Sequence, residues 1–214
     1  MSKNAITPRK PARANGKERY DALLDALESL LLTEPEGDIT LAGIAAAAGV
    51  PAASVYHFFP TKAAAYVALA ETYLTALNET LSRPIFSGSV EKWEDLYDIG
   101  AAAGRAYYEA HPAALILLFG TECRYHVRQL DLLNNRKIGE NLLDAIDRRF
   151  VLPPRSTLLK PFELAVEIHD AVWGASYLNH GRITDEHFRE GGRAVKRYLR
   201  GYLPEYAERR SPKI

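Results

Sequence analysis

The chain has 214 residues, of which 47% are apolar and 25% charged, an ordinary balance for a soluble globular protein. Its 27 basic and 27 acidic side chains cancel, so the overall charge gives no argument for a nucleic-acid partner. The single cysteine, Cys123, excludes an intrachain disulfide framework and fits a reducing compartment. No apolar segment follows the basic N-terminus as in a secretory signal, and none is long enough to span a bilayer. We therefore expect a soluble, cytoplasmic protein without a membrane partner.

The N-terminal segment 1–17 combines basic side chains with residues that break helices. It holds three proline or glycine residues and no acidic side chain, so almost none of it can be buried and we expect it to be flexible. A basic arm of this kind either settles on DNA phosphates or in a minor groove, or stays a solvated tail. Its basic residues are Lys3, Arg9, Lys10, Arg13 and Lys17.

From residue 20 onwards the apolar residues follow helical periodicity. Leucines recur at intervals of three and four between Tyr20 and Leu31, on one face of an amphipathic helix. Pro35 and Gly37 end this helix, and Thr40 is a good N-cap for the next. No period-2 pattern predicts a strand, so we expect an all-α fold of about nine helices. They run from Tyr20 to Leu31, from Thr40 to the interruption at Gly49, from Pro51 to Phe58, from Lys62 to near Arg83, and over about 90–110, 113–119, 121–150 (weakened at Asn134-Asn135), 158–179 and 184–203.

The segment around Gly49 has the residues that a helix-turn-helix corner requires at fixed offsets. Gly49 tolerates the positive φ angle of the turn, and the small Ala45 lets the two helices pass closely. The same spacing also suits an alanine-rich helical hairpin with no role in DNA binding. The apolar side chains that fill such a corner lie five residues before the glycine and one, six and nine after it, at Ile44, Val50, Val55 and Phe58.

The residues on both sides of this corner resemble the DNA-binding domain of the tetracycline-repressor (TetR) family. The resemblance covers about 20–81 and depends most on the segments ITLAGIA (39–45), AGV (48–50) and VYHFFPTK (55–62). It implies a transcriptional regulator with an N-terminal three-helix DNA-binding domain and a C-terminal helical domain for ligand binding and dimerisation. Pro51, which we expect at the first helical position, departs from the family, where Ser or Thr is frequent. Proline offers neither a hydroxyl nor an N–H to a phosphate.

The resemblance and the chemistry of the side chains imply which residues meet double-stranded operator DNA. Small side chains at the start of the recognition helix allow close approach to bases, and the polar groups reach phosphates. Tyr56 also suits packing in the corner, and His57 also suits an uninvolved surface position. Residues 1–80 hold seven basic and nine acidic side chains, so their few cations must be concentrated at the interface. The predicted DNA-binding residues are Thr40, Ala52, Ala53, Ser54, Tyr56, His57, Thr61 and Lys62.

The predicted organisation is a flexible arm (1–17), a DNA-binding domain (18–62), a ligand-binding and dimerisation domain (63–203) and a tail (204–214). One helix-turn-helix reads only a few base pairs, so we expect a homodimer. In the similar family the last two long helices form the dimer seam, although the same side chains also suit packing within one chain. The predicted interface residues are Phe162, Val166, His169, Trp173, Tyr177, Phe188, Val195 and Leu199.

The resemblance further implies that a small-molecule effector binds within about 90–177 and releases a repressor from its operator. Such a ligand would favour the conformer whose recognition helices are wrongly spaced. Aromatic residues with a polar end suit a ligand pocket and equally a helical core. Arg105, Arg124 and Arg128 either neutralise an anionic ligand or lie on exposed helix faces. The predicted ligand-binding residues are Trp93, Tyr97, Tyr107, Tyr108, His111, Tyr125, His126 and Trp173.

Other functions have weaker support in the sequence. Cys123 and His126 lie three residues apart and near His111, but no second cysteine or acidic cluster accompanies them, so we expect no metal site. The same pair lacks an orienting group for nucleophilic catalysis, and serine-hydrolase and phosphate-loop motifs are absent. We therefore expect no enzyme activity and no cofactor. A DNA-organising protein that needs no ligand is the alternative function of the same fold.

Overall fold

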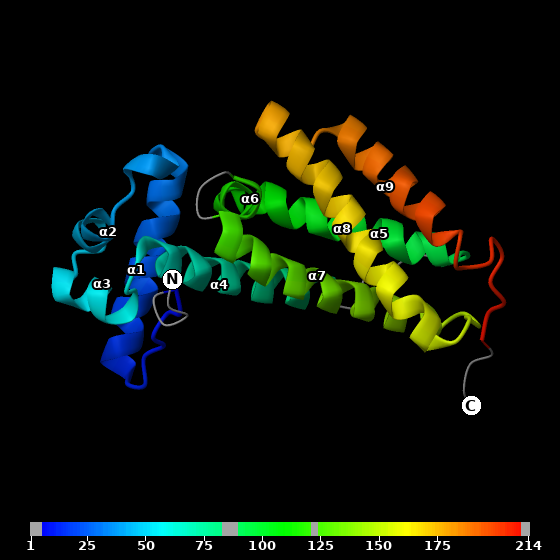
Figure 1. The fold of residues 1–214 in the computed structure, drawn as a ribbon, viewed down its shortest axis with the longest axis horizontal. Helices are drawn as coiled ribbons and strands as arrows, with labels where there is room; N and C mark the ends of the chain where they lie inside the picture. Colours follow the sequence, from blue (N-terminus) through cyan, green and yellow to red (C-terminus); the bar gives the residue numbers. More distant parts are fainter. Residues whose placement is uncertain (1–5, 83–89, 121–123, 211–214) are drawn as a thin grey trace. The chain divides into compact units, whose positions relative to one another are not determined.

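The computed structural model describes residues 6–82, 90–120 and 124–210, and over these residues the chain is helical (Figure 1). The only strand-like pairing in this part of the chain is an isolated bridge between Phe150 and Arg209. The prediction of an all-α fold with about nine helices is confirmed. The elements are α1 (Ala14–Thr33), the 3-10 turn η2 (Glu36–Asp38), α2 (Leu41–Ala47), α3 (Ala52–Phe58), α4 (Lys62–Ser82), α5 (Trp93–Ala110), α6 (Pro112–Phe119), α7 (Arg124–Asp147), α8 (Arg155–His180) and α9 (Asp185–Leu199).

The chain divides into two compact units, and the division differs from the predicted domain boundaries. The first unit comprises residues 1–75 and 111–131, and the second comprises 76–110 and 132–214. The short, almost wholly buried helix α6 returns to the first unit and packs against α1. Its apolar run shows in the sequence, but no local pattern reveals which distant helix it covers.

Local signals account for most helix ends in the first unit. Thr40 caps α2, since its Oγ1 accepts a hydrogen bond from the N–H of Gly43 at 3.0 Å. Thr61 does the same for α4, accepting from the N–H of Ala64 at 3.2 Å. The apolar face of α1 is buried, and the ring of Tyr20 lies edge-on to Phe58 at 5.4 Å between ring centroids. These contacts fix α1 against the two short helices.

The second unit has its own apolar core. Trp93 of α5, Phe162 of α8 and Val195 of α9 are each 0% exposed and belong to one buried cluster. Helices α8 and α9 lie side by side (Figure 1). Gly181 ends α8 in the left-handed conformation at φ 67°, which glycine adopts without strain.

This core corrects the predicted dimer interface. Helical spacing identifies an apolar face but does not show whether that face meets a partner or the chain's own core. Four of the predicted interface residues are buried inside the chain and cannot lie on a surface between two copies: Phe162, Trp173, Val195 and Leu199.

Helix α7 is continuous through Asn134 and Asn135, where the sequence predicts a weak point. Both asparagines are buried. Asn134 accepts a hydrogen bond from the side-chain amide of Asn78, and Asn135 donates to the carboxylate of Asp170 at 3.2 Å. Because their amides have partners on other helices, these residues do not compete with the helix backbone for hydrogen bonds.

At Gly139 the backbones of α7 and α8 approach closely. A Cβ atom at this position would lie 2.8 Å from the carbonyl oxygen of Phe162 and 2.9 Å from the backbone nitrogen of Glu163. We therefore expect Gly139→Ala to lower the free energy of unfolding by about 1–3 kcal/mol, because the backbone of α8 must shift. Urea titration measures this change. The matched control is Gly100→Ala in α5, where a Cβ meets nothing within 4 Å; an equal loss in both variants would contradict the argument.

Candidate nucleic-acid interface and cavity

The corner between α2 and α3 has the geometry that the sequence predicts. Gly49 adopts φ 65°, and the N–H of Val50 donates to the carbonyl of Ala45 at 3.0 Å. The side chains of Ile44 and Val55 are 0% exposed and fill the corner. This packing holds α3 in one orientation relative to α2, which a helix that reads DNA requires.

The predicted base-reading residues share the outward face of α3. Val55 and Phe58 are buried on the opposite face, whereas Ala52 and Ala53 are exposed. Tyr56 is 53% exposed, so its ring does not pack in the corner, the alternative that the sequence leaves open. His57 is also exposed and lies edge-on to the ring of Phe58, at 5.1 Å between centroids. Helix α3 therefore presents small side chains at its start and two polar rings farther along.

Pro51 lies one position earlier relative to the helix than predicted. It is the N-cap of α3, with φ −55° and ψ 137°, and its carbonyl accepts a hydrogen bond from the N–H of Ser54 at 2.8 Å. No side chain caps α3. The first turn of the recognition helix therefore carries no hydroxyl before Ser54, which is half-buried.

Three further predicted DNA contacts lie at helix starts. The hydroxyl of Thr40 is occupied in capping α2, as is that of Thr61 in capping α4. The ammonium of Lys62 lies 5.7 Å from the centroid of the Tyr66 ring, a cation–π distance. The two threonines thus fix helix N-termini, and Lys62 carries the positive charge beside α3.

The N-terminal segment is attached to the first unit from residue 8 onwards, which differs from the predicted flexible arm over 1–17. Pro8 is buried, and the N–H of Arg9 donates to the carbonyl of Phe58 at 2.8 Å, at the end of α3. Lys10 pairs with Glu71 of α4 at 2.9 Å. Helix α1 begins at Ala14, within the predicted arm. Lys3 lies outside the described residues.

This attachment places arginines beside the recognition helix. Arg13 and Arg19, both exposed, line an open hollow together with Ala53, Ser54 and His57 of α3. The composition of the segment predicts its charge but not its position, because its attachment depends on one main-chain hydrogen bond and one buried proline.

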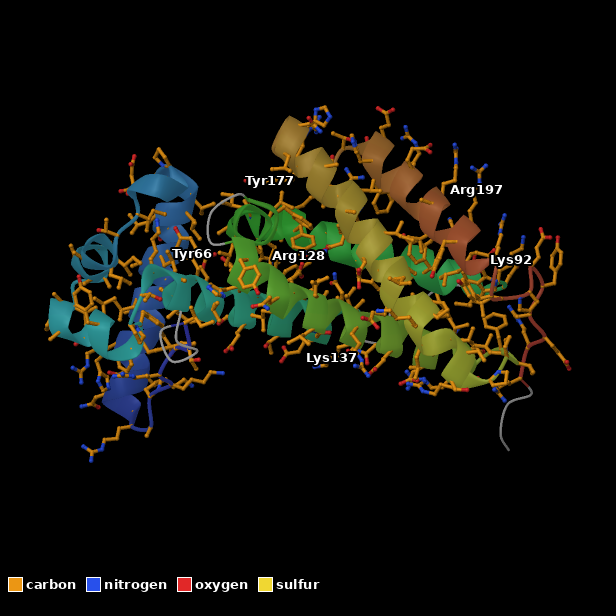
Figure 2. All side chains as sticks on the ribbon, viewed as in Figure 1. Tyr66, Lys92, Arg128, Lys137, Tyr177 and Arg197 are labelled. Atoms are coloured by element: carbon orange, nitrogen blue, oxygen red, sulfur yellow. The ribbon has the colours of Figure 1, made fainter. Side chains whose placement is uncertain are left out.

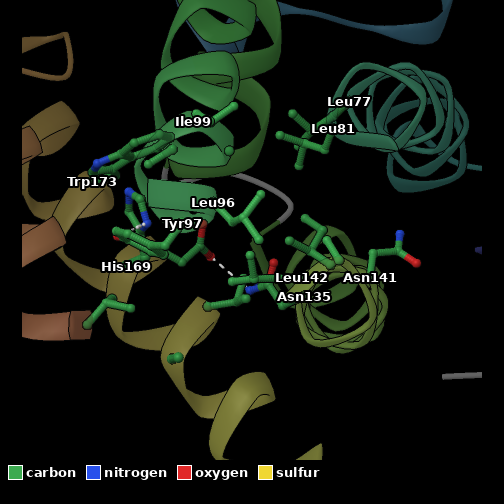
Figure 3. Close-up of a pocket in the computed structure, with 18 of the residues that line it drawn as sticks. Leu77, Leu81, Leu96, Tyr97, Ile99, Asn135, Asn141, Leu142, His169 and Trp173 are labelled. Carbon is green, nitrogen blue, oxygen red and sulfur yellow. Dashed lines mark hydrogen bonds between the residues drawn. The ribbon is translucent and has the colours of Figure 1, made fainter. Parts of the chain in front are cut away.

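The second unit contains a partly open cavity of about 160 Å³ (Figure 3). Helices α4, α5, α7 and α8 supply most of its lining, and α9 adds Val195. Aliphatic side chains form one side, and aromatic and polar side chains of α5, α7 and α8 form the other. The aliphatic side includes Leu77, Leu81, Leu96, Ile99 and Leu142, and the polar side includes Tyr97, Asn135, His169, Asp170 and Trp173.

Two hydrogen-bonded pairs lie on the polar side of the cavity: Asn135 with Asp170, and Tyr97 with His169. The hydroxyl of Tyr97 lies 2.7 Å from Nδ1 of His169, and the ring of His169 is edge-on to Trp173 at 4.1 Å. Burial lowers the pKa of His169 to about 4, because desolvation of the imidazolium outweighs the charge of neighbouring Asp170. Burial likewise raises the pKa of Tyr97. Both groups are therefore uncharged at neutral pH.

The structure separates the predicted ligand-binding residues into three groups. Tyr97, Tyr108 and Trp173 line the cavity. Trp93 belongs to the core, where its Nε1–H donates to the carbonyl of Pro204 at 3.2 Å, and Tyr107 is buried outside the lining. The other three belong to the first unit, and none of them lines the cavity: His111, Tyr125 and His126.

Sequence reasoning missed part of the cavity because it assigned the same helix face to the dimer. Val166 and His169, predicted at the interface, line the cavity, while Tyr177 and Phe188 are half-buried. Asp170 was not singled out. Residues 166, 169, 170 and 173 share one face of α8. Because the sequence predicts Trp173 as a ligand-binding residue, the same helical spacing indicates that its neighbours on this face also line the cavity.

The remaining predictions concern groups outside this cavity. Arg105 pairs with Glu109 at 2.8 Å and with Asp185 at 2.7 Å, and Arg128 pairs with Asp131. Cys123 and the side chain of Arg124 lie outside the described residues. In the part of the chain that the structure describes, no three His, Cys, Asp or Glu side chains gather as a metal site would require.

No described helix combines the length and the apolar character needed to cross a membrane.

Comparisons with known proteins agree with this arrangement. Residues 23–69, which span α1 to the middle of α4, match the family model described as bacterial regulatory proteins, tetR family. A TetR-family transcriptional regulator from Streptomyces coelicolor has 22% identity and a TM-score of 0.69, with 87% of this chain and 98% of that one covered. None of the curated proteins matches the chain.

Two solved repressors share the fold. NalD, the secondary repressor of the MexAB-OprM multidrug efflux pump in Pseudomonas aeruginosa, has 21% identity and a TM-score of 0.58, with 90% and 99% of the two chains covered. SmeT, the repressor of the Stenotrophomonas maltophilia pump SmeDEF, has 17% identity and a TM-score of 0.56, with 87% and 91% covered. The helix-turn-helix segment of the chain therefore matches the tetR family of bacterial regulatory proteins, and the chain shares the fold of these solved regulators.

Proposed function

We propose that the protein is a transcriptional repressor that binds double-stranded operator DNA as a homodimer and is released by a small molecule in the cavity. The observation that carries the proposal is the exposed face of α3, where small side chains precede Tyr56 and His57. That NalD and SmeT are repressors supports repression rather than activation. The proposal includes no catalytic activity and no cofactor.

The dimer requires a surface other than the buried residues of the predicted seam. Helix α8 exposes Ala171, Ala175 and Leu178, which share one face at helical spacing, and Leu178 is 50% exposed. Small and apolar side chains allow two such helices to approach closely. On α9, Arg197 is exposed and extends away from the helix (Figure 2). We place the seam along the small-residue face of α8, with charged residues of α9 at its rim.

Release would follow from a shift between two conformers. Helix α4 begins at Lys62, beside the recognition helix in sequence, and carries Leu77 and Leu81 in the cavity lining. A ligand that binds one conformer of this helix more tightly lowers operator affinity by its preference for that conformer. A factor of ten in operator affinity requires a preference of about 1.4 kcal/mol.

The direct test is to select DNA from a random pool with the purified protein and sequence it. A repressor of this kind should enrich a palindrome whose half-sites are separated by about one or two helical turns. Compounds are then screened for release of that DNA. Enrichment of no sequence would contradict the proposal, and specific binding that no compound weakens would favour the ligand-independent alternative.

The attached N-terminal segment gives a prediction about salt dependence. We expect Arg13→Ala with Arg19→Ala to weaken operator binding and to lower the slope of log affinity against log salt by about 2 per protomer, because two phosphate contacts are lost. Fluorescence anisotropy across a salt series measures this. The matched control replaces Arg136 and Lys160, which are exposed in the second unit. An unchanged slope for the first variant would place both arginines away from DNA.

A further inference from the structure

We propose that the cavity binds an uncharged amphiphile of about the size of an eight-carbon alcohol, with its chain among the leucines and its hydroxyl at the Tyr97–His169 pair. The inference rests on the proposed function, since it names the class of effector for the cavity described above. It is drawn from the volume, polarity and charge of the lining.

The volume limits the size of the ligand. A cavity of about 150 Å³ is known to hold a benzene molecule, and this cavity measures about 160 Å³. Ligands of drug size occupy pockets of about 300–1,000 Å³. The cavity therefore suits a molecule well below drug size, with on the order of ten non-hydrogen atoms or fewer, and an eight-carbon alcohol lies within this range.

The arrangement of the lining gives the ligand two ends. Leu77 and Leu81 lie together in Figure 3, away from His169 and Tyr97. The amide of Asn141 points away from this group of aliphatic side chains (Figure 3). A hydrocarbon chain therefore finds apolar contacts on one side, and polar atoms are confined to the other.

The charge of the lining disfavours an anion. Among the described residues that line the cavity there is no lysine or arginine, whereas Asp170 contributes a carboxylate. His169 is held neutral, so it offers no positive charge. The arginines suggested by the sequence bind other acids: Arg105 pairs with Glu109 and Asp185, and Arg128 with Asp131. A ligand carboxylate would lose its hydration next to another carboxylate without gaining a charged partner.

The hydrogen-bonding capacity of His169 favours a hydroxyl. Within the described structure its Nε2 is buried without a hydrogen-bond partner, while Nδ1 is paired with Tyr97. If Tyr97 donates to Nδ1, then Nε2 carries the proton and donates; in the other tautomer Nε2 accepts. A hydroxyl both donates and accepts, so it satisfies either tautomer. An ammonium only donates, and Asp170, the carboxylate in the lining, already accepts a hydrogen bond from Asn135 at 3.2 Å. Burying the charge of an ammonium in this mainly hydrocarbon cavity therefore costs more than burying a hydroxyl.

The experiment compares three probes with the same chain: 1-octanol, octanoate and octylammonium. Binding to the full-length protein at pH 7.5 is measured by calorimetry, with Trp173 fluorescence as a second signal because this ring lines the cavity. We expect octanol to bind at least ten-fold more tightly than either ion. His169→Phe should weaken octanol binding by about ten-fold, the value of one lost hydrogen bond. The control His180→Phe makes the same substitution on an exposed residue of α8 and should leave binding unchanged.

The outcomes separate the ligand class from the proposed function. Tighter binding of octanoate, or of octylammonium, would overturn the uncharged class, as would no binding of any probe. Retained octanol affinity in a His169→Phe variant that has a normal circular-dichroism spectrum would overturn the placement of the hydroxyl. If that variant does not fold, His169→Leu, which also has no hydrogen-bonding group, takes its place. Release of operator DNA is measured separately. If octanol binds but the operator DNA stays bound, the uncharged ligand class is supported and release by a ligand is contradicted. If octanoate binds more tightly and releases the DNA, release by a ligand is supported and the uncharged class is contradicted.

Discussion

Replacing both Tyr56 and Lys62 by alanine should reduce operator affinity on the order of a hundred-fold per protomer, which amounts to loss of specific binding in a standard gel-shift assay. Tyr56 lies on the outward face of α3 and is 53% exposed, so its loss removes a contact with DNA rather than with the core. Lys62 supplies the positive charge at the start of α4, next to the recognition helix. Each lost contact is worth about 1–2 kcal/mol at physiological salt.

The chain offers a matched control for this double variant. Tyr206 and Lys92 are also an exposed tyrosine and an exposed lysine, and both belong to the second unit. Tyr206→Ala with Lys92→Ala should leave operator binding unchanged. Circular dichroism and sedimentation should show the same helicity and the same assembly for both double variants. Full operator binding by the Tyr56 and Lys62 variant would move the interface away from α3.

The helix-turn-helix could be predicted because its geometry depends on residues close together in sequence. The positive φ of Gly49 requires glycine, the corner requires Ile44 and Val55, and Thr40 caps α2 by contacting a backbone group three residues away. All of these residues fall between Thr40 and Val55, so the segment that specifies the corner is short. Amphipathic periodicity extends the same argument to the longer helices, which is why the all-α class was predictable.

The attachment of the N-terminal segment could not be predicted in this way. The backbone N–H of Arg9 donates a hydrogen bond to the carbonyl of Phe58, about fifty residues away. Because almost every residue has the same backbone groups, the sequence does not indicate such a hydrogen bond. Helix α6 is a similar case, because its apolar run suits any core and only the tertiary structure shows that it covers α1. Propensity and hydrophobic pattern indicate which side of a helix is buried, but they do not indicate which other element that side packs against.

The cavity was predicted only in part for a related reason. Trp93 and Trp173 have the same chemistry and similar burial, yet one belongs to the core and the other lines the cavity. His169 lies on an apolar face of α8 that suited an interface, a core or a cavity equally well in the sequence. The distinction arises from how four helices leave space between them, which depends on side-chain volumes summed over distant segments.

The stability of the protein should depend on His169 in mildly acidic solution. The pKa of this residue is about 4 in the folded protein, below its ordinary value of 6.5, so between these values the unfolded chain binds more protons than the folded one. Stability therefore falls as the pH decreases through this range, and the group has no such effect above pH 7. The loss amounts to about 3 kcal/mol by pH 4. Urea unfolding at pH 7.5, 6, 5 and 4 measures it.

Because carboxylates also titrate near pH 4, the informative quantity is the difference between wild type and His169→Gln. Glutamine has no titrating group and can still accept a hydrogen bond from the hydroxyl of Tyr97. The wild type should lose about 3 kcal/mol more than this variant between pH 7.5 and 4, with most of the difference appearing below pH 6. Exposed His180 has no comparable burial, so His180→Gln should follow the wild type throughout. Parallel pH profiles for wild type and His169→Gln would mean that the imidazolium is solvated in the folded protein. The inference that a neutral His169 favours an uncharged ligand would then fail as well.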